Sequence, residues 1–146
     1  MNTITRKRLI DAGWHEKRDV DIGIYIEKFH KIGLDIPVNI ESFLRNFGML
    51  KIDVPEKTYF DVEFNPLKAI GNNLDADYFK ECLSDYGILE TGYPIGVACR
   101  NNLIILMTIT DVVYCFTDGC LVKAGNSIEE MLDCLVGECK EIEEIE

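Results

Sequence analysis

The 146-residue sequence lacks any long apolar run. Its longest aliphatic stretch, Leu103 to Met107, has five residues, whereas a membrane-spanning helix needs about twenty. Near the N-terminus, basic residues are followed by Leu9 and Ile10 and then at once by Asp11, so the apolar region of a signal peptide is missing. We therefore expect a soluble protein of the cytoplasm with no membrane partner.

Basic charge is also scarce. The sequence has 26 Asp and Glu against 15 Lys and Arg, a formal net charge of −11. Nucleic-acid binding depends largely on basic charge, so we predict no nucleic-acid partner. A basic protein partner is favoured instead, because electrostatic attraction between an acidic and a basic protein speeds their association. Residues 126–146 hold eight acids and one lysine, and we expect the acidic end, residues 138–146, to fray, because carboxylates oppose the dipole at a helix C-terminus.

The patterns of catalytic and metal sites are missing as well. Only His15 and His30 are present, and there is no phosphate-binding glycine loop or nucleophile-elbow serine. The six cysteines never form a C-x-x-C pair, which disfavours zinc, and the missing export signal disfavours disulfides. We predict no catalytic residue, no metal and no cofactor. A small enzyme that uses a cysteine or paired carboxylates is the minor alternative.

The first third of the chain has the apolar spacing of helices, and glycines follow the expected helix ends. Near the other end, Ser127 and Glu130 form a capping box in front of an amphipathic stripe. The spacing predicts helices over 6–12, 22–32, 40–47 and 76–85 and after Ser127.

From residue 50 the apolar period changes to two, which is typical of half-buried strands. A hairpin is predicted over 50–64, and turn residues then separate the strands of a meander. These later strands are expected over 94–99, 103–109, 112–116 and 120–123. The prediction is a single α+β domain over residues 1–146, in which helices pack on a mostly antiparallel sheet made of a hairpin plus a meander.

The only tryptophan, Trp14, follows a glycine helix stop, and Arg18 comes four residues later. One interpretation is structural: Trp14 folds back as an apolar plug, and Arg18 fastens the loop through a carboxylate or backbone carbonyls. The other is that the two residues form an exposed binding hot spot, because Trp and Arg dominate such sites. The structural interpretation is favoured, and both stay open at this point.

Short motifs follow one another along nearly the whole chain. They are Ala12-Gly13-Trp14 with Arg18-Asp19-Val20, Phe43-Leu44, Phe47-Gly48-Met49-Leu50, Phe64-Asn65-Pro66, Tyr93-Pro94-Ile95-Gly96, Val113-Tyr114 and Gly125-Asn126-Ser127-Ile128-Glu129-Glu130. In this order the set resembles one branch of the SUKH superfamily of bacterial immunity proteins, which opens with A-G-W and R-x-V. One departure is Thr110-Asp111, where related sequences often carry glycine; we expect only the turn geometry to change.

The resemblance implies a SUKH-like α+β fold and a binding protein rather than an enzyme. Many of its members protect a cell by binding a cognate polymorphic toxin in the cytoplasm. Such toxins are frequently nucleases or nucleic-acid deaminases, including domains joined to an LXG-type secretion domain. The matched motif positions are expected to be fold determinants. A regulatory or scaffold interaction protein is the alternative, because eukaryotic relatives resemble adaptors. No pattern favours a particular oligomeric state.

Acidic charge suggests where a basic toxin, whose cleft binds phosphates, would dock. We expect contacts on the outer face of the hairpin and around the end of the 76–85 helix, although plain solvated faces are the competing interpretation. The predicted contact acids are Asp53, Glu56, Asp61, Glu63, Asp85 and Glu90.

Overall fold

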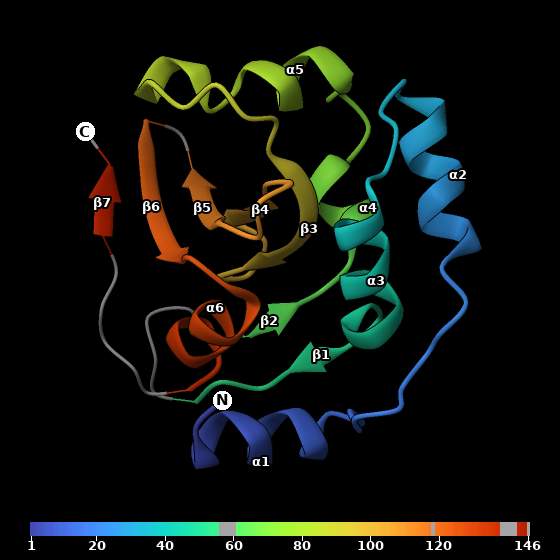
Figure 1. Ribbon diagram of the computed structural model, residues 1–146, viewed down its shortest axis with the longest axis vertical. Coiled ribbons are helices and arrows are strands. Elements are labelled where there is room, and N and C mark those ends of the chain that lie inside the picture. Colours follow the sequence, from blue (N-terminus) through green and yellow to red (C-terminus); the bar gives the residue numbers. More distant parts are fainter. Residues whose placement is uncertain (56–60, 118, 138–142, 146) are drawn as a thin grey trace.

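The computed structural model describes residues 1–55, 61–117, 119–137 and 143–145, and it contains one seven-stranded antiparallel sheet flanked by helices (Figure 1). The helices are α1 (Thr3–Asp11), α2 (Gly23–Lys31), α3 (Val38–Phe47), α4 (Pro66–Ile70), α5 (Ala76–Glu81) and α6 (Ile128–Leu135), with the 3-10 turn η1 (Ser84–Tyr86). The strands are β1 (Lys51–Ile52), β2 (Val62–Glu63), β3 (Tyr93–Ala98), β4 (Leu103–Met107), β5 (Val113–Thr117), β6 (Cys120–Gly125) and β7 (Glu143–Ile145). The predicted α+β class is confirmed.

The strands lie in the sheet in their sequence order, β1 to β7, and each described neighbour pair is antiparallel. The hairpin and the meander of the prediction are therefore parts of one sheet, joined where β2 pairs with β3. Figure 1 shows α1 below β1 and α5 across the opposite end, and α3 and α4 both pack on β3. Part of the predicted hairpin, residues 56–60, lies outside the described residues.

The helix ends follow the local sequence closely. Asn2 caps α1, and Gly13 follows it with φ +111°, a left-handed conformation that favours glycine. Ser127 caps α6 by accepting from the Glu130 amide at 3.1 Å, while the Glu130 carboxylate accepts from the Asn126 amide at 3.3 Å. The predicted capping box is thus present, but the Glu130 carboxylate accepts from the amide of Asn126 and not from that of Ser127.

The 76–85 helix is divided into α5 and η1, and one further helix was not predicted. The predicted hairpin ends at residue 64, directly before Asn65 and Pro66. The Asn65 side chain accepts from the Leu67 amide at 3.0 Å, and Pro66 occupies the first turn of α4. An N-cap asparagine before proline is a helix start signal, because proline has no amide to leave unpaired there.

The acidic tail differs in part from the expected fraying. Residues 143–145 form β7 and pair with β6, with Ile145 opposite Leu121. Ile145 also packs against the core, so backbone pairing and apolar contact together hold this segment in the sheet. Residues 138–142 and 146 lie outside the described part of the chain.

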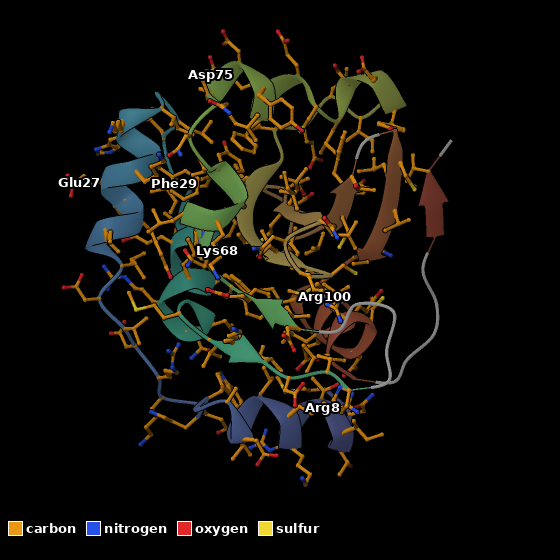
Figure 2. All side chains as sticks on the ribbon, turned by 180° about the vertical axis from the view of Figure 1, so that it is seen from behind. Arg8, Glu27, Phe29, Lys68, Asp75 and Arg100 are labelled. Atoms are coloured by element: carbon orange, nitrogen blue, oxygen red, sulfur yellow. The ribbon has the colours of Figure 1, made fainter. Side chains whose placement is uncertain are left out.

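An aromatic cluster joins the helices to the hairpin. Phe43 and Phe47 of α3 stack at a centroid distance of 5.0 Å, and Phe64, which follows β2, meets Phe43 edge-on at 5.1 Å. All three rings are buried. Figure 2 shows the same inward packing on α2, where Phe29 points to the core and Glu27 points away. The apolar faces that the sequence indicated are therefore the faces that pack into the core.

Candidate partner-binding surface

The Trp14 ring lies inside the molecule, against α3. Only 6% of the residue is exposed, and its ring stacks on Phe47 with centroids 5.7 Å apart and planes 6° apart. The indole nitrogen donates to the Asn46 side chain at 3.0 Å, and the Arg6 guanidinium lies 5.5 Å from the ring centroid. This is the arrangement that the structural interpretation of Trp14 describes.

Arg18 fastens the same loop. Its guanidinium donates to the Asn46 carbonyl oxygen at 3.0 Å, and the Asn46 side-chain amide donates back to the Arg18 carbonyl oxygen at 2.9 Å. Asn46 thus holds Trp14 and Arg18 at once, a role that no motif in the sequence indicated. Both residues of the candidate hot spot have their polar groups bonded within the chain.

The outer face of the hairpin carries both signs of charge. A shallow cavity of about 170 Å³ there is lined by charged side chains from four segments: Lys51, Asp61, Glu63, Lys68 and Arg100. Lys51 lies opposite Glu63 in the β1–β2 register. In Figure 2, Lys68 and Arg100 lie on either side of β2. The structure brings Asp61 and Glu63 together as predicted, but it also places three cations beside them.

Glu63 forms an ion pair with one of these cations, Lys68. Its carboxylate accepts from the Lys68 ammonium at 2.8 Å and from the Asn65 amide at 3.2 Å, and its side chain is 17% exposed. Burial raises the pKa of Glu63, but the hydrogen bonds from Lys68 and Asn65 outweigh it and leave the pKa below its ordinary value. The carboxylate is therefore charged at neutral pH and already paired.

We expect Glu63→Gln to lower the free energy of unfolding by about 1 kcal/mol at pH 7, because a half-buried charge-assisted hydrogen bond is lost. A lowered folded-state pKa stabilises the fold above the unfolded value of about 4.3, and this contribution is lost as the pH falls through the folded-state pKa. The difference between variant and parent should therefore shrink below about pH 4. Urea titrations at pH 7 and pH 3.5 measure it, with the exposed Asp61→Asn as the control; an equal difference at both pH values would contradict the pairing.

The other predicted contact acids are spread over the molecule. Asp53 is exposed after β1 and lines a separate cavity of about 460 Å³ together with α1. Asp85 is exposed in η1, and Glu56 lies outside the described residues. Among the described acids, Asp53 thus shares the neighbour Lys51 with the hairpin acids, whereas Asp85 belongs to a separate element.

Glu90 belongs to a hydrogen-bonded junction at the turn between β4 and β5. Its carboxylate oxygens accept from the Thr110 hydroxyl at 3.1 and 3.3 Å. From the other side, the Asn39 side-chain amide donates to the Thr108 carbonyl oxygen at 3.0 Å and to the Asp111 carboxylate at 2.9 Å. The junction joins the segment before β3, the β4–β5 turn and the start of α3. Sequence reasoning found Glu90 but missed this junction.

Three exposed apolar side chains adjoin the junction in sequence: Val38 beside Asn39, Leu89 beside Glu90, and Ile109 between Thr108 and Thr110. The exposed Asp35 precedes Val38 by three residues, and its charge adds to the effect of burial in raising the pKa of Tyr93. We call this surface the turn patch. It consists of Val38, Leu89, Ile109, Asp35, Glu90 and Asp111.

The turn also explains the departure from the motif set. Asp111 has φ +68°, a left-handed conformation in which glycine is favoured and aspartate is among the better-tolerated alternatives. Its side chain gains the hydrogen bond from Asn39, which glycine cannot accept. Aspartate thus adopts a conformation that glycine prefers, and the expected effect on turn geometry stays a prediction.

In the described part of the chain, the cysteines are buried or half-buried thiols that form no disulfide bond. Cys82, Cys115 and Cys134 are buried, and burial raises the pKa of Cys82 to about 11 and raises that of Cys115 as well. A thiol must lose its proton to attack or to bind a metal, so burial disfavours both. Among the described residues, no three histidine, cysteine or acidic side chains gather in a way that could hold a metal ion.

The chain matches a known family along most of its length. The model of the family described as SUKH-3 immunity protein matches residues 1–138. No curated protein and no solved structure gives a significant match. In the part of the chain that the structure describes, every helix is too short or too polar to cross a bilayer.

Proposed function

The chain belongs to the SUKH-3 immunity protein family, and from this premise we propose that it neutralises one cognate toxin by binding it directly in the cytoplasm. The family match over residues 1–138 carries the proposal, because it assigns a toxin-immunity role to nearly the whole chain. Inhibition by binding needs no catalytic group. The thiols of Cys82 and Cys115 are buried with raised pKa values, and the Glu63 carboxylate is paired with Lys68, so none of the three is an activated nucleophile or base.

We propose further that the toxin is a nuclease, an RNase or a DNase, of the LXG type, with a nucleic-acid deaminase as the second candidate. The net charge of −11 supports this, because an enzyme that acts on nucleic acid presents basic charge to phosphates. An acidic inhibitor is attracted to the same surface, and steering of this kind can raise association rates to about 10⁸ M⁻¹s⁻¹ at low salt.

The proposed sources of this attraction are the exposed acids Asp53, Asp61 and Asp85 and the partly buried Glu90. Glu63 adds less charge to the field than its sequence position suggested, because Lys68 neutralises it locally. Charge reversal at Asp61 and Glu63 tests the hairpin contribution: toxin affinity and its salt dependence should both fall, and unchanged values would remove the hairpin from the contact surface.

Co-expression tests the proposal as a whole. The C-terminal toxin domain encoded beside this gene should arrest growth when expressed alone, and the full 146-residue chain should restore growth. Light scattering after size exclusion should show a stoichiometric complex of the chain with a catalytically inactivated toxin domain. Absence of both rescue and complex would contradict the proposal and favour the scaffold alternative.

A further inference from the structure

Exposed apolar area is concentrated in the turn patch. Seven large apolar side chains are exposed among the described residues, and the three most exposed are Leu89 at 91%, Val38 at 77% and Ile109 at 62%. The other four are Ile4 and Ile10 on α1, Ile24 on α2 and Met49, two residues after α3. Single exposed apolar residues are ordinary, but a cluster drawn from three chain segments is typical of an interaction site.

Hydrogen bonds within the chain hold the three segments of the turn patch together without a partner. The bonds from Asn39 to Thr108 and Asp111, and from Thr110 to Glu90, join the three segments that carry its apolar side chains. The Asp111 backbone is in the left-handed region, which defines the turn further. A surface ordered in advance loses less conformational entropy on binding, so more of its contact energy appears as affinity.

Three carboxylates accompany these apolar side chains. Glu90 and Asp111 belong to the junction itself, and the exposed Asp35 precedes Val38 by three residues in the chain. An apolar centre with a charged rim is the usual anatomy of a protein interface, in which the centre supplies affinity and the rim supplies orientation and rate. The carboxylates fit a basic partner.

We infer that the turn patch is the surface that docks on the toxin, with Val38, Leu89 and Ile109 at the centre of the contact and Asp35, Glu90 and Asp111 facing basic residues of the toxin. The inference rests on the proposed function and gives it a location. It differs from the hairpin placement in that affinity depends on apolar contact at the β4–β5 turn as well as on charge.

The test measures binding of the inactivated toxin domain encoded beside this gene to variants of the full chain. The double variant Leu89→Ser and Ile109→Ser should bind about tenfold more weakly or worse, because exposed side chains that become an interface centre carry most of its energy. Its thermal unfolding should match the parent, since both side chains are largely exposed. Glu90→Gln should slow association at low salt and flatten the salt dependence.

Ile24→Ser on α2 is the matched control, because Ile24 is 53% exposed and lies outside the patch. It should bind like the parent. If the parent binds and the double variant binds equally well, the patch inference fails while the proposed function stands. The inference also fails if the double variant changes only self-association, since the patch would then face a second copy of the chain. A parent that binds no toxin domain overturns both.

Discussion

Replacing Gly96 by alanine is expected to destabilise the fold by about 3 kcal/mol or more. Gly96 lies in β3 directly against the neighbouring strand, and a Cβ added there would meet the Glu63 carbonyl oxygen and, at 2.9 Å, the Cα of Phe64. Both obstacles are backbone atoms, so no side chain can turn aside to make room. Strands β2 and β3 would have to separate at the point where the hairpin joins the meander.

The measurement is urea unfolding followed by the fluorescence of the single tryptophan, beside Gly23→Ala as the matched control. At Gly23 the nearest atom to an added Cβ is the end of the Asp21 carboxylate at 3.1 Å, a group that can move. Gly23→Ala should change the free energy of unfolding by less than about 1 kcal/mol, because Gly23 is exposed at the first position of α2. Equal stability of Gly96→Ala and the parent would show that β2 and β3 are not packed as described.

Removal of the Trp14 ring should cost about 3–5 kcal/mol of folding free energy, the usual range for a large aromatic side chain truncated in a core. Trp14→Ala loses the stacking on Phe47 and leaves the Asn46 side-chain oxygen without its indole donor. The loop that Asn46 holds to Arg18 should loosen with it. Thermal or chemical unfolding, followed by circular dichroism, measures this loss.

Trp14→Phe separates a structural role from a role in binding. Phenylalanine keeps most of the stacking and lacks the indole donor, so we expect a smaller loss of about 1–2 kcal/mol. Affinity of the folded variant for the toxin domain should equal that of the parent, because the ring is only 6% exposed. A folded Trp14→Phe protein that bound the toxin domain much more weakly would place Trp14 in the contact after all.

The helices and strands could be predicted from the sequence wherever their signals are local. Apolar spacing marks the helical first third, alternation marks the hairpin, and Ser127 with Glu130 marks the start of α6. The prediction was incomplete where two signals overlap. Asn65-Pro66 ends a strand and also begins α4, and the fraying expected from charge at the C-terminal end is overcome for residues 143–145 by pairing with β6.

The candidate site was less predictable, because proximity of segments far apart in the chain decides it. Charge counting indicated Glu63 as a free acid, yet Lys68 neutralises it through the turn into α4. The prediction placed Ile109 within the strand 103–109 and gave Leu89 no role, whereas β4 ends at Met107 and both side chains are exposed. The junction through Asn39, Thr110 and Glu90 helps to bring their segments together.

By itself, the sequence determined the α+β class, the excess of acid and the absence of the usual catalytic spacings, because composition and short-range periodicity carry this information. Tertiary structure alone decided which charges are neutralised and which apolar side chains remain exposed. It also decided that Gly96 must leave room for the backbone at Phe64 and that Asn46 holds both Trp14 and Arg18. These contacts join residues about 30 positions apart in the chain, a separation at which local preferences carry no information on pairing.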